Sequence, residues 1–120
     1  MNCLKTYLFL FFVFIFTNTF AQSLNDYKTI SSGNWTTIAV WQRYNGTSWV
    51  AATYYPGNGA TNDVSIVNNN NILVGITIAG TINSVTIGDR TGTGLASIET
   101  LTITATAGLN TTNFTIAHDG

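Results

Sequence analysis

Charged residues are scarce in this chain of 120 residues, which has four Lys or Arg and five Asp or Glu for a formal net charge of −1. A protein that binds nucleic acid electrostatically needs a basic face, so the composition excludes that class of partner. Aliphatic residues recur along the whole sequence, which also excludes a disordered acidic tail. We find no known arrangement of catalytic groups and predict no enzyme activity, no cofactor and no metal ion.

Cysteine and proline are also nearly absent, with one residue of each. Cys3 lies in a short basic start, ahead of ten consecutive apolar residues at 7–16 and a small-residue stretch that ends before Gln22. This is the layout of a secretory signal peptide. Ten residues rise about 15 Å as a helix, roughly half of a bilayer core, which argues against a membrane anchor. We therefore predict cleavage of residues 1–21, a secreted or cell-surface location, and no integral membrane segment afterwards.

The aromatic residues of the remaining chain are concentrated in its first part. Seven of them fall before the turn-rich stretch 56–59, and only Phe114 follows it. The seven are Tyr27, Trp35, Trp41, Tyr44, Trp49, Tyr54 and Tyr55. Large aromatics are mostly core material, so we expect residues 22–59 to form an aromatic-rich N-terminal cap and residues 60–120 a second zone.

A short unit recurs in that second zone: an apolar residue, then Ser or Thr, then Ile. It occupies residues 64–66, 76–78, 85–87, 101–103 and 114–116. Alternation with period two places the apolar residues on one face of a strand and the hydroxyl on the other. Such units at irregular offsets are typical of a β-solenoid, in which Val85, Leu101 and Phe114 would stack in one inward ladder. An all-β sandwich built from hairpins is the alternative.

Asparagine and glycine are expected to form the corners between these strands. The run at 68–71 is four consecutive Asn, a residue type that tolerates left-handed backbone. Glycines at 75, 80, 88 and 108 are likewise predicted to lie in corners that need positive φ.

The order of these features resembles a known family. Ser32-Gly-Asn-Trp35, Trp41, Pro56-Gly57, the strand from Asn62 to Ile66 and the strand from Ile82 to Gly88 follow one another. They look like the start of large secreted bacterial surface proteins with a right-handed parallel β-helix, many of which leave the cell by type IX secretion and act as adhesins. The resemblance implies the same fold and a surface location, and it carries over no catalytic residue. Without the family's C-terminal sorting domain, the solenoid coils of residues 60–120 are expected to be truncated.

Three aromatic residues are the best candidates for ligand contact. The flat faces of Trp49, Tyr54 and Tyr55 could support sugar rings, with a polysaccharide or a cell-surface matrix as partner, whereas Trp35 and Trp41 are expected to be buried. The competing interpretation is that all these rings close the first coil of the solenoid.

The remaining motifs are weak. The glycine-rich stretch 88–94 lacks the Lys-Ser/Thr ending of a phosphate loop, and His118 has no partner residues of a metal or catalytic site. Only Asp89 and Glu99 could serve as the paired carboxylates of a sugar-cleaving enzyme. The preferred hypothesis is a non-catalytic structural or adhesion protein. A carbohydrate-binding module and the N-terminal part of a β-helical polysaccharide-degrading enzyme are the alternatives.

Overall fold

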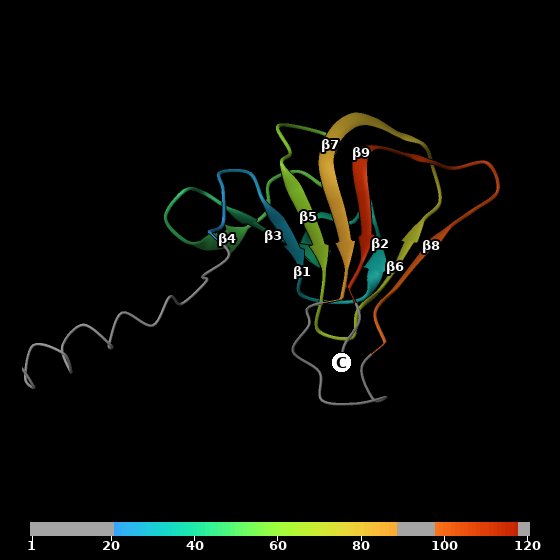
Figure 1. The fold of residues 1–120 in the computed structure, drawn as a ribbon, viewed down its shortest axis with the longest axis horizontal. Helices are drawn as coiled ribbons and strands as arrows, with labels where there is room; N and C mark the ends of the chain where they lie inside the picture. The colour runs from blue at the N-terminus through green and yellow to red at the C-terminus, as the bar shows by residue number, and fades with distance from the viewer. Residues whose placement is uncertain (1–20, 89–97, 118–120) are drawn as a thin grey trace, which may run out of the picture.

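The computed structural model describes residues 21–88 and 98–117 (Figure 1). The predicted signal peptide, apart from its last residue, lies outside this range, as do Asp89, most of the glycine-rich stretch and His118. Regular structure in the described part consists of strands and one short 3-10 helix, η1, at Ile38–Val40. That part holds no helix of the length and apolar character needed to cross a membrane.

The strands form two sheets, which confirms the prediction of an all-β protein. The six-stranded sheet has the order β4-β3-β1-β5-β7-β9, and the three-stranded sheet has the order β2-β6-β8. In chain order the strands are β1 (Tyr27–Thr29), β2 (Gly33–Asn34), β3 (Trp41–Tyr44), β4 (Trp49–Ala51), β5 (Asp63–Ile66), β6 (Asn71–Val74), β7 (Ile78–Ile87), β8 (Thr100–Ile103) and β9 (Leu109–Ile116).

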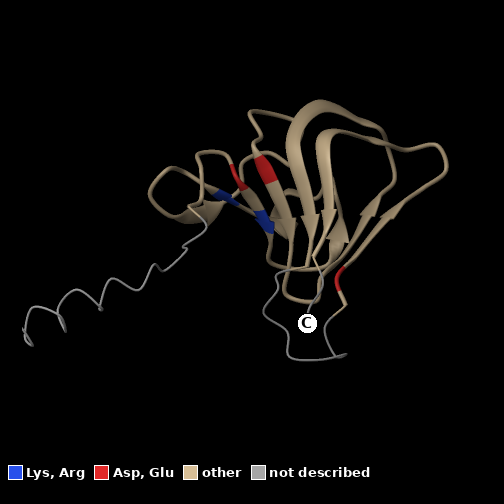
Figure 2. Ribbon diagram, in the orientation of Figure 1, with Lys and Arg blue, Asp and Glu red and all other residues tan. Residues whose placement is uncertain are grey.

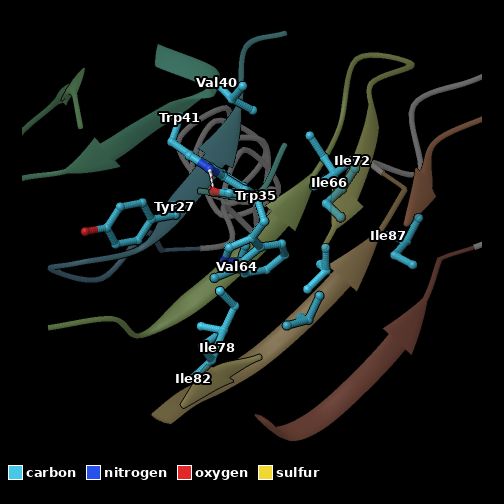
Figure 3. Close-up of a cluster of buried hydrophobic side chains, with 12 residues drawn as sticks. Tyr27, Trp35, Val40, Trp41, Val64, Ile66, Ile72, Ile78, Ile82 and Ile87 are labelled. Atoms are coloured by element: carbon cyan, nitrogen blue, oxygen red, sulfur yellow. Dashed lines mark hydrogen bonds between the residues drawn. The ribbon is translucent and has the colours of Figure 1, made fainter. Parts of the chain in front are cut away.

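From β5 onward, consecutive strands alternate between the two sheets, and within each sheet they pair in parallel. The first strands join the same pattern, because β1 pairs in parallel with β5 and β2 with β6. Among the described strands, β3 pairs antiparallel with both β1 and β4, at one edge of the six-stranded sheet. The buried apolar side chains of both sheets belong to one cluster (Figure 3), so the core lies between the sheets.

The register of the parallel strands corrects one sequence-based expectation. Val85 stacks on Val64 and Phe114 within the six-stranded sheet, whereas Leu101 pairs with Ile72 in the other sheet. The predicted ladder through Val85, Leu101 and Phe114 is therefore wrong. Alternation with period two indicates which face of a strand a residue occupies. Strands of both sheets share this alternation, so it does not indicate to which sheet a strand belongs.

The corners follow the prediction at the asparagine run and only partly at the glycines. Asn68 and Asn69 both have φ of 59°, in the left-handed region. Of the four glycines predicted at positive φ, only Gly88 has it, at 100°. Gly80 instead lies inside β7, where a register shift interrupts the pairing with β9.

Trp35 and Trp41 are buried as predicted, each with 1% of its surface exposed. Their rings meet edge to face with centroids 4.9 Å apart. The Trp41 indole Nε1 donates to the carbonyl oxygen of Trp35 at 2.8 Å (Figure 3), and the Trp35 indole Nε1 donates to the carbonyl oxygen of Pro56 at 2.8 Å. Both polar groups are thus satisfied inside the core, which makes the burial of these large rings favourable.

A buried threonine joins the end of β1 to the corner that follows β5. The Thr29 hydroxyl donates to the carbonyl oxygen of Val67 at 3.0 Å and accepts from the Val67 amide at 2.9 Å. The side chain of Thr29 is fully buried. It therefore provides the two hydrogen bonds that a neighbouring strand would otherwise provide.

Replacing Thr29 with valine is expected to lower the free energy of unfolding by about 2 kcal/mol, because both polar groups of Val67 lose their partner. Urea denaturation of the two proteins measures the difference. Thr102→Val, the same change at an exposed position of β8, is the control and should stay within about 0.5 kcal/mol of the parent. Equal effects of the two substitutions would contradict this role of Thr29.

Candidate functional site

The three aromatic residues predicted to contact a ligand do not share one site. Trp49 is half-buried on β4 and lines a depression on the outer face of the six-stranded sheet. Tyr54 and Tyr55 do not line it. Half of the Tyr54 surface is exposed in the loop after β4, and Tyr55 packs against the core cluster. Of these three residues, Trp49 alone therefore lies beside the polar side chains of the depression.

The depression has a volume of about 530 Å³. Its floor is a row of side chains in register across four adjacent strands: Lys28, Ser65, Thr86 and Thr115. On β1, β5 and β7 these positions alternate with buried residues, so they face outward, and Thr115 shares that face through its register with Thr86. Asp63 and Ser84 form part of a second row, one pleat away.

Trp49 is held in place by two neighbours at one end of this row. Tyr44, its cross-strand partner on β3, contacts the ring edge to face with centroids 5.5 Å apart. The Lys28 ammonium lies 4.5 Å from the centroid of the Trp49 ring. A cation over an indole face is attracted by the quadrupole of the ring, so Lys28 and Trp49 attract each other.

The two carboxylates of the depression have different surroundings. Asp26 accepts hydrogen bonds at both oxygens, from the amides of Ser23 and Asp63 and from the Asn62 side chain, at 2.7 to 3.2 Å. Asp63 accepts from Ser84 Oγ at 2.8 Å and from Asn83 Nδ2 at 2.7 Å, and both bonds go to Oδ1. Asp26 thus uses both oxygens to hold neighbouring segments of the chain together, whereas Asp63 keeps one carboxylate oxygen that accepts no hydrogen bond from the described residues.

The charged groups gather on this side of the molecule. Figure 2 shows the Lys, Arg and Asp residues near β1, β3 and β5. In the chain, Glu99 directly precedes β8 in the other sheet. Oε1 of Glu99 accepts from the Asn69 amide at 3.0 Å, and the side chain is buried. Glu99 therefore stabilises the asparagine corner. Its predicted partner Asp89 lies outside the described residues.

Tyr27 lines the depression, but its ring belongs to the core. The hydroxyl is buried and has no hydrogen-bond partner among the described residues. Burial raises the pKa of Tyr27, and the nearby Arg43 guanidinium opposes that rise in part. The phenol is accordingly neutral at physiological pH and is no proton acceptor. Residues 21–88 and 98–117 also contain no group of three or more His, Cys, Asp or Glu that could hold a metal ion.

Sequence reasoning missed Lys28 and Asp63 as members of a site, while the outward hydroxyls of Ser65, Thr86 and Thr115 followed from the alternation. No local signal links Lys28 to Trp49, because their contact depends on β3 lying between β1 and β4. Long-range strand pairing creates the depression.

Comparison with protein-family models, with curated proteins and with solved structures finds no match to this chain. The class that the fold defines is an all-β protein of two sheets, with a polar depression on the outer face of the larger one.

Proposed function

We propose that this chain is a secreted or cell-surface structural and adhesion protein, without catalysis of its own, whose scaffold is the start of a right-handed parallel β-helix. The observation that carries the proposal is the parallel register. Val64, Val85 and Phe114 stack in one sheet while Ile72 and Leu101 stack in the other. A chain that visits two sheets in turn and stacks each strand on its predecessor forms coils, in which every coil covers the core of the one before.

The spacing of the strands supports the same proposal. Val85 and Phe114 are 29 residues apart, and so are Ile72 and Leu101. The last step therefore has the same length in both sheets, whereas the preceding step from Val64 to Val85 is 21 residues.

The aromatic residues fit the role of a cap at the first coil. Trp35 and Trp41 fill the core beside β1 and β2, and the antiparallel strands β3 and β4 extend the sheet beyond β1. The edge strand β4 has only three residues. Short edge strands limit pairing with other chains, as expected at the closed end of a solenoid.

The surface location is supported by the sequence of residues 1–21 and by the outward side chains. The outer row of the larger sheet consists mainly of hydroxyl residues, with few charges. A sheet of this kind needs neither disulfides nor a metal for stability, because its core is continuous.

Locating the protein in cells that produce it tests the proposal. We expect it in the medium or on the cell surface, digested by protease added to intact cells, with Gln22 as its first residue by mass spectrometry. Phe12→Asp, which interrupts the apolar run, should keep the protein inside and serves as the control. A parent protein that stays in the cell with residues 1–21 attached would overturn the proposal.

A further inference from the structure

The depression on the outer sheet has the dimensions of a site for a short chain of sugars. Its floor row crosses four strands from Lys28 to Thr115, and three strand spacings of about 4.8 Å give it a length of about 14 Å. A volume of about 530 Å³ lies within the range of small-molecule sites in proteins. The row is straight because its members are in register, so it suits an extended ligand.

The side chains of the row offer every kind of hydrogen bond that a sugar needs. The hydroxyls of Ser65, Thr86 and Thr115 both donate and accept, the Lys28 ammonium donates, and Asp63 accepts. Oδ2 of Asp63, which accepts no hydrogen bond from the described residues, is a strong acceptor in the depression, because a charged acceptor forms stronger hydrogen bonds than a neutral one. Sugar hydroxyls also donate and accept, so the two sets are complementary.

Trp49 adds an apolar surface at one end of this polar row. The CH groups of a sugar ring form an apolar patch, which packs favourably on an aromatic ring. Tyr44 limits the motion of the indole through its edge-to-face contact, so little conformational entropy of the ring is lost when a ligand binds there.

The charges of the depression do not favour anionic ligands. Its lining contains one ammonium, Lys28, two carboxylates, Asp26 and Asp63, and Gln22, whose α-amino group becomes a second positive charge once residues 1–21 are removed. Because the two signs balance, the depression gives polyanions such as uronic-acid polymers no net attraction and leaves neutral chains unaffected.

We propose that the depression binds a neutral polysaccharide, with Trp49 stacking on one sugar ring and Asp63, Lys28 and the hydroxyl row bonding to its neighbours. This assignment rests on the adhesive role proposed above and gives it a ligand class. It replaces the sequence-based set of Trp49, Tyr54 and Tyr55 with residues that share one face.

Retention of the full mature chain on insoluble polysaccharides tests the assignment. Cellulose, xylan, chitin and a β-1,3-glucan are the neutral probes, and a calcium alginate gel is the anionic one. We expect retention on at least one neutral probe and none on alginate. Trp49→Ala and Asp63→Asn should each lower the affinity for the retained probe at least tenfold. Asp63→Asn keeps the shape of the side chain, so it remains informative if Trp49→Ala does not fold.

Tyr54→Ala is the matched control, because it removes an exposed aromatic residue outside the depression and should leave binding unchanged. Circular dichroism confirms that each variant is folded. The assignment is overturned by retention on none of the neutral probes, by stronger retention on alginate, or by an equal loss in Tyr54→Ala. A protein that reaches the cell surface but fails these tests would overturn the ligand assignment alone.

Discussion

Replacing Gly80 with alanine is expected to lower the free energy of unfolding by about 3 kcal/mol, the upper end of the usual cost of overpacking. A Cβ at this position would overlap the carbonyl oxygen of Gly57 and lie 2.7 Å from the carbonyl carbon. These are backbone atoms, which cannot move aside as a flexible side chain does. Gly57 itself has φ of 86°, so the loop that approaches β7 is constrained on both sides of the contact.

Urea denaturation of Gly80→Ala against the parent measures this effect. Gly75→Ala is the control, because a Cβ there meets no atom within 4 Å and the backbone is not left-handed. It should change stability by no more than about 0.5 kcal/mol. Similar stabilities of the two variants would show that the loop at Gly57 does not pack on β7 as described.

Trp35→Ala should have the largest effect of any truncation in the core, a loss of about 4 kcal/mol. The substitution removes a ring with 1% of its surface exposed and the hydrogen bond from its indole to Pro56. It also removes the edge-to-face contact with Trp41. Since small domains are stable by only about 5 to 15 kcal/mol, a large part of the total would be lost.

Trp35→Phe separates these contributions, because it keeps a ring beside Trp41 and loses the indole donor. We expect a loss of about 2 kcal/mol, part of which is the unpaired carbonyl of Pro56. Chemical denaturation followed by tryptophan fluorescence, with Trp49→Ala as the half-buried control, gives all three values. A loss in Trp49→Ala as large as that in Trp35→Ala would contradict the assignment of Trp35 as the centre of the cap.

The sequence predicted the local features of the fold well. Burial of Trp35 and Trp41 follows from their size and apolar character, and the left-handed backbone at Asn68 follows from its residue type. The sheet to which Leu101 belongs could not be predicted. Strand pairing depends on the lengths of the segments that connect the strands, and a repeated three-residue unit gives no information about those lengths.

The same limit applies to the candidate site. Trp49 was predicted as a ligand-contacting residue because of its type, and so were Tyr54 and Tyr55. The depression instead combines Trp49 with residues 28, 63, 65 and 86, which come from three other strands. Their proximity arises only when β1 pairs with both β3 and β5, a long-range event that no local pattern records.

The two hydrogen bonds of the Thr29 side chain limit which amino acids can replace it. Its one oxygen both donates to and accepts from Val67, at a distance that only a side chain with the hydroxyl on Cβ spans from this backbone. Asparagine would need its amide oxygen and its amide nitrogen to form the same pair of bonds, and valine has no polar side-chain atom. Serine is the single natural replacement that keeps both bonds. Sequence variation among functional forms of this protein should therefore be confined at position 29 to Thr and Ser, however freely the outer face changes.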